Sequence, residues 1–182
     1  MTSIFLQLLI NGIIAGAIYA LVASGFSLIY STNKFVHFAH GGVIALSAYF
    51  LFWLFSKLGL NFYLSALLTI LFSSLLGYIL NKIFYRPLRA KKSSSSILLI
   101  VSIAILILLE SLALLFFGAD VKIINFIKNN QGVDFFGAII TPLQIVIILV
   151  SAILFFVLFV FMKKSKIGKA MRAVADNRDV AE

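Results

Sequence analysis

ILLIVSIAILILLESLALLFF, residues Ile97–Phe117, is among the clearest apolar runs of the chain and indicates its class of fold. It carries one charged side chain, Glu110, among residues that are almost all apolar. As an α-helix rising about 1.5 Å per residue, such a run is roughly as long as the hydrocarbon core of a bilayer is thick. Because lipid offers no hydrogen bonds, the backbone must satisfy itself, which predicts a membrane-spanning helix.

The same pattern recurs along the rest of the chain. Of the 182 residues, 63% are hydrophobic, and the mean hydropathy is +1.15. A water-soluble domain of this size could not bury so much apolar surface. We therefore expect an all-α, polytopic transmembrane helical bundle of about five spans. The other four apolar runs cover residues 4–30, 35–56, 62–84 and 139–162.

The basic residues predict the orientation of these spans. Five of them lie between residues 82 and 92, six between 163 and 178, and Lys34 precedes the second run. By the positive-inside rule these segments are cytoplasmic, which places the N-terminus and residues 118–138 outside. On that assignment 12 of the 15 basic residues are cytoplasmic, so the net charge of +9 is a topology signal. A nucleic-acid partner is not expected.

Both histidines of the chain, His37 and His40, lie three residues apart and are followed by Gly41 and Gly42. A helix beginning only at Gly41 would span about 24 Å, too short to cross comfortably. The preceding segment must therefore enter the membrane, as the first helical turns or as an unwound approach, which is tolerated only beside protein or a water-filled cavity. We expect these four residues to line the cytoplasmic part of a substrate path.

Three other roles for the histidine pair remain open. A metal site would need three or four ligands, and two histidines supply only two. A proton relay is the second alternative, because ionisable groups within a membrane are often functional. The third is a structural role, with both imidazoles hydrogen-bonded to neighbouring spans. The favoured hypothesis includes no metal.

Polar and small residues inside two other spans also need an explanation. Glu110 must face the bundle, be neutral or find a partner, since a bare carboxylate in lipid costs several kcal/mol. It is assigned either to a structural hydrogen bond or to the substrate path. In the first span small residues recur every four positions, which lets a second helix approach closely within the bundle or from another subunit. These are Gly12, Gly16, Ala20 and Ser24.

Sequence motifs of enzymes are missing. The chain has no nucleophile elbow, phosphate-binding loop or cysteine, so we expect neither enzymatic activity nor a cofactor. Its last stretch, KKSKIGKAMRAVADNRDVAE (Lys163–Glu182), combines small apolar residues with charges of both signs. This composition predicts a short amphipathic helix that docks onto a protein partner.

Four stretches together resemble the permease subunits of branched-chain amino acid ABC transporters, in particular the H-type subunit. They are NGIIAGAIYALVASGFSLIY (Asn11–Tyr30), VHFAHGGVIALSAY (Val36–Tyr49), YRPLRAKK (Tyr85–Lys92) and SKIGKAMRAVADNRDVAE (Ser165–Glu182). The resemblance implies a multi-pass permease of a bacterial or archaeal plasma (inner) membrane. It also implies import driven by cytoplasmic ATP-binding subunits, a second permease subunit and an external substrate-binding protein.

In this resemblance the C-terminal stretch corresponds to the cytoplasmic coupling loop that touches the ATPase. Residues 1–182 then form one transmembrane permease domain that is truncated, with 163–182 as the start of the coupling loop. The residues implied to make the ATPase contact are Gly168, Ala170, Met171, Arg172, Ala173, Asp176, Arg178, Ala181 and Glu182.

Two positions depart from the family pattern. Gly42 stands where members usually carry an acidic residue, and Ser47 replaces the usual glycine before Ala48-Tyr49. Permeases of the same architecture for urea, short amides or sugars therefore remain alternatives to a branched-chain amino acid permease. A stand-alone membrane carrier or scaffold protein is the alternative outside this class.

Overall fold

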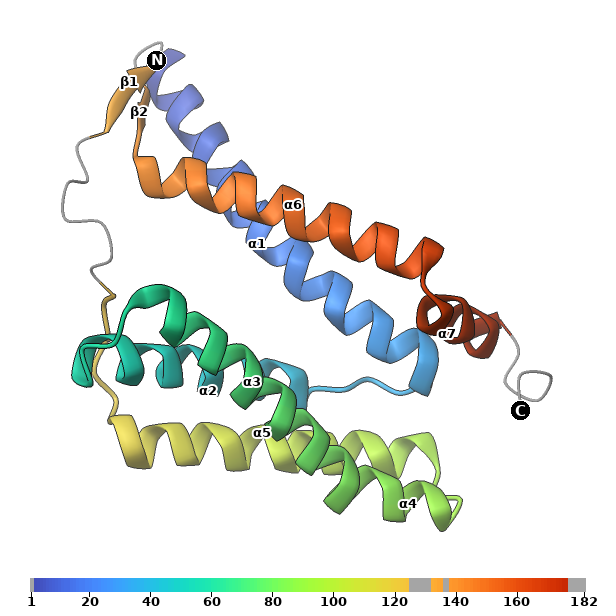
Figure 1. Ribbon diagram of the computed structural model, residues 1–182. Helices are drawn as coiled ribbons and strands as arrows, with labels where there is room; N and C mark the ends of the chain where they lie inside the picture. Colours follow the sequence, from blue (N-terminus) through green and yellow to red (C-terminus); the bar gives the residue numbers. More distant parts are fainter. Residues whose placement is uncertain (1, 125–131, 136–137, 177–182) are drawn as a thin grey trace. The chain divides into compact units, whose positions relative to one another are not determined.

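The computed structural model describes residues 2–124, 132–135 and 138–176 (Figure 1). It divides into two compact units, each of which is described by itself. Unit 1 consists of residues 1–33 and 127–182, and unit 2 of residues 34–126. Within the described residues, five helices are long and apolar enough to cross a membrane. The chain is thus an all-α, multi-pass membrane protein, as the apolar runs predict.

The helices begin and end close to the ends of the apolar runs, and two of the spans contain a π-helical turn. In unit 1 the helices are α1 (Thr2–Asn33), α6 (Pro142–Lys164) and α7 (Lys166–Asp176). In unit 2 they are α2 (Ala39–Phe52), η1 (Trp53–Lys57), α3 (Phe62–Leu80), η2 (Asn81–Tyr85), α4 (Arg86–Ala90) and α5 (Ser95–Phe117).

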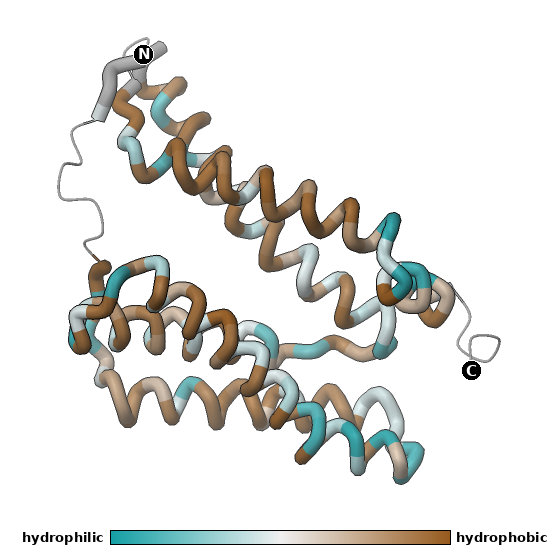
Figure 2. The backbone as a smooth tube through the Cα atoms, viewed as in Figure 1, coloured by the Kyte–Doolittle hydropathy of each residue, from teal (hydrophilic) through white to brown (hydrophobic). Residues whose placement is uncertain are grey.

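The spans are apolar around most of their circumference, because lipid replaces water as their solvent. Figure 2 shows hydrophobic residues along α5 and α6, with hydrophilic residues gathered at α4 and α7. Many large apolar side chains of the spans are exposed, for example Phe156 at 68%. In a membrane these surfaces contact lipid or further protein.

The core of unit 2 forms where α2 packs against α5 and α3. Phe35, Ala39, Leu80, Tyr85, Leu98, Ile105 and Leu109 make one buried cluster. On α5 the buried positions recur at helical spacing, from Leu98 through Ser102, Ile105 and Leu109 to Ala113. This stripe is the side of α5 that packs within its own unit.

The span formed by α3, η2 and α4 continues through Pro87, although a proline inside a helix would be expected to end it. The π-helical turn at residues 81–85 lies directly before this position, and Pro87 falls in the first turn of α4. The irregular hydrogen bonding of the π-helical turn, in which the Arg86 N–H donates to the Asn81 carbonyl, coincides with the place where the proline lacks its N–H, so the span continues. The span ends only at Ala90.

In unit 1, α1 packs beside α6 and α7. It is continuous from Thr2 to Asn33, so Asn11 does not interrupt the helix. Instead the Asn11 side chain accepts hydrogen bonds from the amides of Gln7 and Gln144, each at 3.5 Å. These bonds satisfy a polar side chain that would be costly within a span.

A short two-stranded β-sheet precedes α6, in a part of the chain for which the sequence predicted no strand. Strands β1 (Val133–Phe135) and β2 (Ala138–Ile140) pair antiparallel, with Val133 opposite Ile140. Gln7 holds this sheet to α1, because its side chain accepts from the Ile139 N–H at 2.8 Å and donates to the Ile139 carbonyl at 3.2 Å. Strands of three residues are too short to show the alternation of apolar and polar residues from which a strand is predicted.

Candidate functional site

Residues 34–38, directly before α2, are non-helical. The helix begins at Ala39, so His40, Gly41 and Gly42 belong to its first turn, while His37 lies in the unwound approach. Of the two arrangements left open by the sequence, the structure therefore has the unwound one. The segment packs against protein on one side only: Phe35 is 5% exposed and belongs to the core of unit 2, Val36 and His37 are half-buried, and Lys34 and Phe38 are exposed.

A serine on α5 holds this unwound segment. The hydroxyl of Ser102 accepts a hydrogen bond from the Phe38 N–H at 3.2 Å. The same hydroxyl lies within donating distance of two carbonyl oxygens, that of Val36 at 3.2 Å and that of Leu99 at 2.8 Å. Ser102 is fully buried, so it supplies the polar partner that unwound backbone requires where water is excluded.

The His37 ring packs edge-on against two aromatic rings, with centroid separations of 4.9 Å to Tyr85 and 5.8 Å to Phe35. The imidazole Nδ1 and the Tyr85 hydroxyl are both buried and have no hydrogen-bond partner in the structure. Burial, reinforced by His40 and Arg89, lowers the pKa of His37 to about 4. His37 is therefore neutral at physiological pH and can serve as one donor and one acceptor.

The glycine pair has two different environments. A Cβ on Gly42 would lie 3.1 Å from Cδ1 of Leu109 and 3.2 Å from Cδ1 of Leu106, so this glycine lets α2 approach α5 closely. A Cβ on Gly41 would meet no atom within 4 Å. The close approach of α2 to α5 is thus made at Gly42 alone, whereas Gly41 lies on the exposed side of α2.

Glu110 is not part of the histidine cluster. It lies eight residues beyond Ser102 on α5, which is about 12 Å farther along the helix axis. Its side chain is exposed and falls outside the stripe of α5 that packs within unit 2. The Glu110 carboxylate therefore lies within an apolar span, on a side of α5 that the described residues do not cover.

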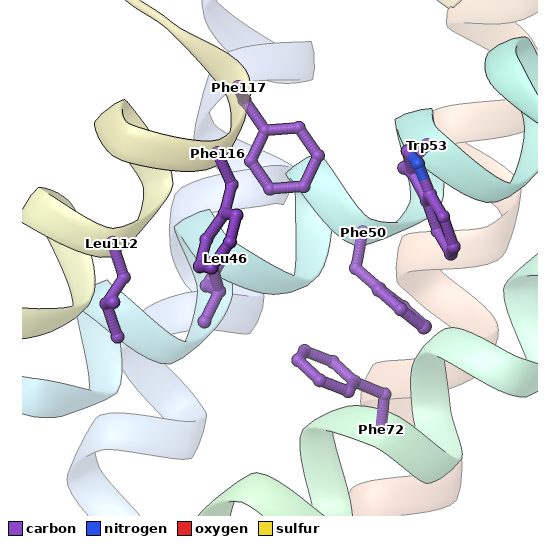
Figure 3. Close-up of a pocket in the computed structure, with 7 residues that line it drawn as sticks. All are labelled: Leu46, Phe50, Trp53, Phe72, Leu112, Phe116 and Phe117. Carbon is purple, nitrogen blue, oxygen red and sulfur yellow. The ribbon is translucent and has the colours of Figure 1, made fainter.

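A separate apolar cavity of about 360 Å³ opens between α2, η1, α3 and α5 (Figure 3). Phe50 and Phe72 stack across it with their ring centroids 4.1 Å apart. The indole N–H of Trp53 is the only polar side-chain group in its lining. This cavity is suited to an apolar group. The lining residues are Leu46, Phe50, Trp53, Phe72, Leu112, Phe116 and Phe117.

Helix α7 follows α6 after a sharp turn at Ser165. The Ser165 hydroxyl accepts from the Gly168 N–H at 2.8 Å and so caps the start of α7. A Cβ on Gly168 would lie 2.6 Å from the carbonyl oxygens of Phe161 and Met162, which only glycine avoids. Gly168 is thus needed for the angle between α6 and α7.

The residues assigned to the ATPase contact differ in their exposure, and some of them lie outside the described part of the chain. Ala170, Arg172 and Ala173 are exposed, and with the exposed Ile167 the two alanines form a strip at spacing three. Gly168 is buried and Met171 half-buried against the chain's own helices. Asp176 ends α7. Arg178, Ala181 and Glu182 lie outside the described residues.

The small residues of α1 do not pack against the other helices of unit 1. Cβ atoms on Gly12 and Gly16 would meet nothing within 4 Å, and Ala20 is exposed. The Ser24 hydroxyl donates to the Leu21 carbonyl of its own helix at 2.7 Å. In the described part of unit 1 this face is open, and its role in helix packing stays a prediction.

Sequence reasoning did not assign a role to Ser102, Tyr85 or Arg89, which surround the histidine segment. Arg89 donates through its Nη2 to the Asn81 side chain and through its Nε to the Tyr85 carbonyl at 3.4 Å. A serine inside an otherwise apolar run was the signal for Ser102, because a buried hydroxyl needs partners. In the described residues no group of three or more His, Cys, Asp or Glu gathers as metal ligands would.

Comparison with known proteins places residues 8–182 in the family model described as branched-chain amino acid transport system / permease component. The chain is 31% identical over 187 residues to the high-affinity branched-chain amino acid transport system permease protein BraD of Pseudomonas aeruginosa, covering 95% of this chain and 60% of BraD. It is 31% identical over 191 residues to LivH of Salmonella typhimurium, with 97% and 61% covered.

LivH of Escherichia coli K12, which carries the same description, is 30% identical over 189 residues, again with 97% of this chain and 61% of the relative covered. The chain thus spans about 60% of the length of these relatives. No solved structure matches it significantly.

Proposed function

The chain belongs to the family of branched-chain amino acid transport permeases, and on this premise we propose that it is the membrane-spanning permease subunit of an ATP-driven importer for branched-chain amino acids. The observation that carries the proposal is the family match over residues 8–182, which includes almost all of the five apolar helices. Such a subunit catalyses no reaction itself, and a separate partner hydrolyses ATP. Urea, short amides and sugars remain the alternative substrates.

In the assembled transporter, residues 1–182 contribute one permease domain with the N-terminus outside. The positive charges at 82–92 and 163–178 then face the cytoplasm of a bacterial or archaeal cell. Its proposed partners are cytoplasmic ATP-binding subunits, a second permease subunit and an external substrate-binding protein. The open face of Gly12, Gly16, Ala20 and Ser24 on α1 is suited to close helix packing.

We assign His37, His40, Gly41 and Gly42 to the cytoplasmic part of the substrate path. The support is the unwound backbone at residues 34–38, since irregular backbone next to broken helices marks substrate paths in other transporters. His37 is neutral, so it adds hydrogen-bonding capacity to this segment without placing a charge there.

Glu110 is proposed to face the same path at a deeper level. Its carboxylate is exposed on the surface of unit 2 within an apolar span, and facing lipid there would cost several kcal/mol. It must therefore face water or protein in the assembled transporter. An amino acid substrate carries an ammonium group that a carboxylate would attract.

The Glu110 assignment predicts a substrate-dependent effect in the assembled transporter. Glu110→Gln should lower leucine uptake at least tenfold while leaving the amount of assembled protein unchanged. Ser111→Ala, next to it on α5, is the matched control and should retain uptake. Loss of assembled protein in Glu110→Gln would instead identify Glu110 as a structural hydrogen-bond partner.

The proposed ATPase contact is the exposed strip of α7. Ile167, Ala170 and Ala173 offer a small apolar surface bordered by the charges of Lys169 and Arg172, as a helix docking into a protein groove requires. Gly168 sets the direction in which this strip is presented.

The test is a transport assay with reconstituted transporter. Ala173→Asp buries a charge in the docking surface and should abolish both ATP-driven leucine uptake and the stimulation of ATP hydrolysis. Ala173→Ser, which keeps the small size without a charge, should preserve both. Full uptake in Ala173→Asp would exclude this strip as the contact, and ATP-independent leucine transport would favour a stand-alone carrier.

A further inference from the structure

A second cavity in unit 2 lies where α4 meets α5. It has a volume of about 290 Å³ and is lined by Ile83, Phe84, Pro87, Leu88, Val101 and Lys91. Five of these residues are apolar, and the sixth is a lysine. Ile83 is 58% exposed and Phe84 37%, so the apolar wall is open to the surroundings of the unit.

The position of this groove in the chain places it at the edge of the membrane. The span containing α4 ends at Ala90, and the next span begins at Ser95. Lys91 therefore lies at the polar boundary, whereas Ile83 and Val101 lie one to two helical turns inside their spans. An occupant would need an apolar part in the hydrocarbon layer and a polar part at its surface.

Charge indicates the sign of that polar part. The segment that lines the groove carries a basic cluster, defined here as Lys82, Arg86, Arg89, Lys91 and Lys92, of which Lys91 lines the groove itself. No aspartate or glutamate occurs in the sequence before Glu110, which lies about 22 Å along α5 from Ser95. Nothing acidic in the neighbouring sequence neutralises the cluster, so its surface is complementary to an anion.

Local backbone geometry adds to this complementarity. Helix α4 ends in a Schellman motif, in which the Ser93 N–H donates to the Leu88 carbonyl at 3.1 Å and the Lys92 N–H to the Arg89 carbonyl at 2.9 Å. Lys92 occupies the left-handed position at φ 53°, where glycine is usual. Helix α5 then starts without a side-chain cap from Ser94, so its positive end is open to an anionic group.

We propose that this groove binds an anionic phospholipid. Part of one acyl chain lies against Ile83, Phe84 and Val101, and the phosphate lies beside Lys91 and Lys92. The volume corresponds to about ten groups the size of water, which suits the upper part of an acyl chain. A soluble anion would leave the apolar wall unused, and a zwitterionic lipid would not match the basic cluster.

The test uses brominated lipids, which quench tryptophan fluorescence on contact. Trp53 is the only tryptophan, so Trp53→Phe with Phe84→Trp reports on this groove alone. In phosphatidylcholine vesicles, brominated phosphatidylglycerol should quench the indole introduced at position 84 at several-fold lower mole fraction than brominated phosphatidylcholine. The unmodified protein is the matched control, because Trp53 lines the other cavity and should not distinguish the two lipids.

Charge variants then test the basic cluster. Lys91→Gln and Lys92→Gly should each reduce the preference for phosphatidylglycerol by about fivefold. Lys57→Gln, at the end of a different span, should leave it unchanged. Glycine favours the left-handed conformation at residue 92, so Lys92→Gly should not impair folding. A weaker preference for phosphatidylglycerol in this variant would then result from the loss of the lysine charge.

Three results would overturn the proposal: equal quenching by the two lipids, quenching by neither, or a preference that survives Lys91→Gln with Lys92→Gly. The second would show that protein covers the groove. Native mass spectrometry of the unmodified chain provides a measurement free of the tryptophan substitutions. Phosphatidylglycerol should remain bound at collision energies that remove phosphatidylcholine, and equal release of the two lipids would also contradict the site.

Discussion

The backbone N–H of Phe38 donates a hydrogen bond to the hydroxyl of Ser102, 3.2 Å away and 64 residues later in the chain. This bond fixes the unwound segment before α2 to the packed face of α5. It accounts for a polar side chain in the core-facing stripe of an otherwise apolar helix, and for the tolerance of irregular backbone at residues 34–38.

Replacing Ser102 by alanine should therefore destabilise unit 2. The substitution leaves the Phe38 N–H without the hydroxyl that accepts its hydrogen bond, at a cost of about 1–3 kcal/mol. The free energy of unfolding, measured by denaturant titration in detergent micelles, should fall by that amount. Ser111→Ala on the exposed side of the same helix should change it by less than about 0.5 kcal/mol. Equal effects of the two substitutions would show that the hydrogen bond between Ser102 and the segment before α2 does not stabilise the protein.

The two adjacent glycines should respond differently to the same substitution. Gly42→Leu forces extra methylenes against Leu106 and Leu109 and should lower the free energy of unfolding by about 1–3 kcal/mol or more. Gly41→Leu projects into open space and should cause no comparable loss, since leucine favours a helix more than glycine does. The same titration checks both, and a larger loss in Gly41→Leu would contradict the packing of α2 on α5.

Acidification should destabilise the protein through His37. Its pKa is lowered from 6.5 to about 4, so between these values the folded state binds fewer protons at this side chain than the unfolded state does. The contribution of His37 to stability is thus complete above pH 6.5 and decreases as the pH falls toward 4.

The checking measurement compares pH profiles. The free energy of unfolding of the unmodified chain should fall more steeply between pH 6.5 and 4 than that of His37→Gln, which cannot titrate. Carboxylates titrate in both proteins and cancel in the difference. Parallel profiles, or an imidazolium signal from His37 at about pH 6 in NMR spectra, would show that this ring is not held neutral.

The orientation of the spans is testable because the natural chain has no cysteine. Single cysteines at Ser94 and Asn129 should react with a membrane-impermeant reagent from opposite sides, with Ser94 accessible from the cytoplasm. The physical reason is the retention of positively charged loops on the cytoplasmic side. Labelling of both positions from the same side would invalidate the assignment of the N-terminus to the outside.

Much of the fold was readable from the sequence because a membrane imposes a simple rule. Apolar runs of sufficient length must be helices, so the five spans and their approximate limits follow from residues such as those of Ile97–Phe117. The small apolar residues and mixed charges of Lys163–Glu182 predicted a helix after the last span, and α7 is present there. These features depend on local composition, which a single sequence displays in full.

The sequence was thus enough to identify lipid as the solvent of this protein, to count its spans and to recognise its family resemblance. Three features became visible only in the folded chain: Ser102 binds the segment before α2, His37 contacts Tyr85, and Glu110 lies on an open face apart from both. Because a span in lipid is apolar on nearly every face, its hydropathy does not predict which face packs against another helix. That choice is made by close packing, as at Gly42, and by a few buried polar partners far apart in the chain.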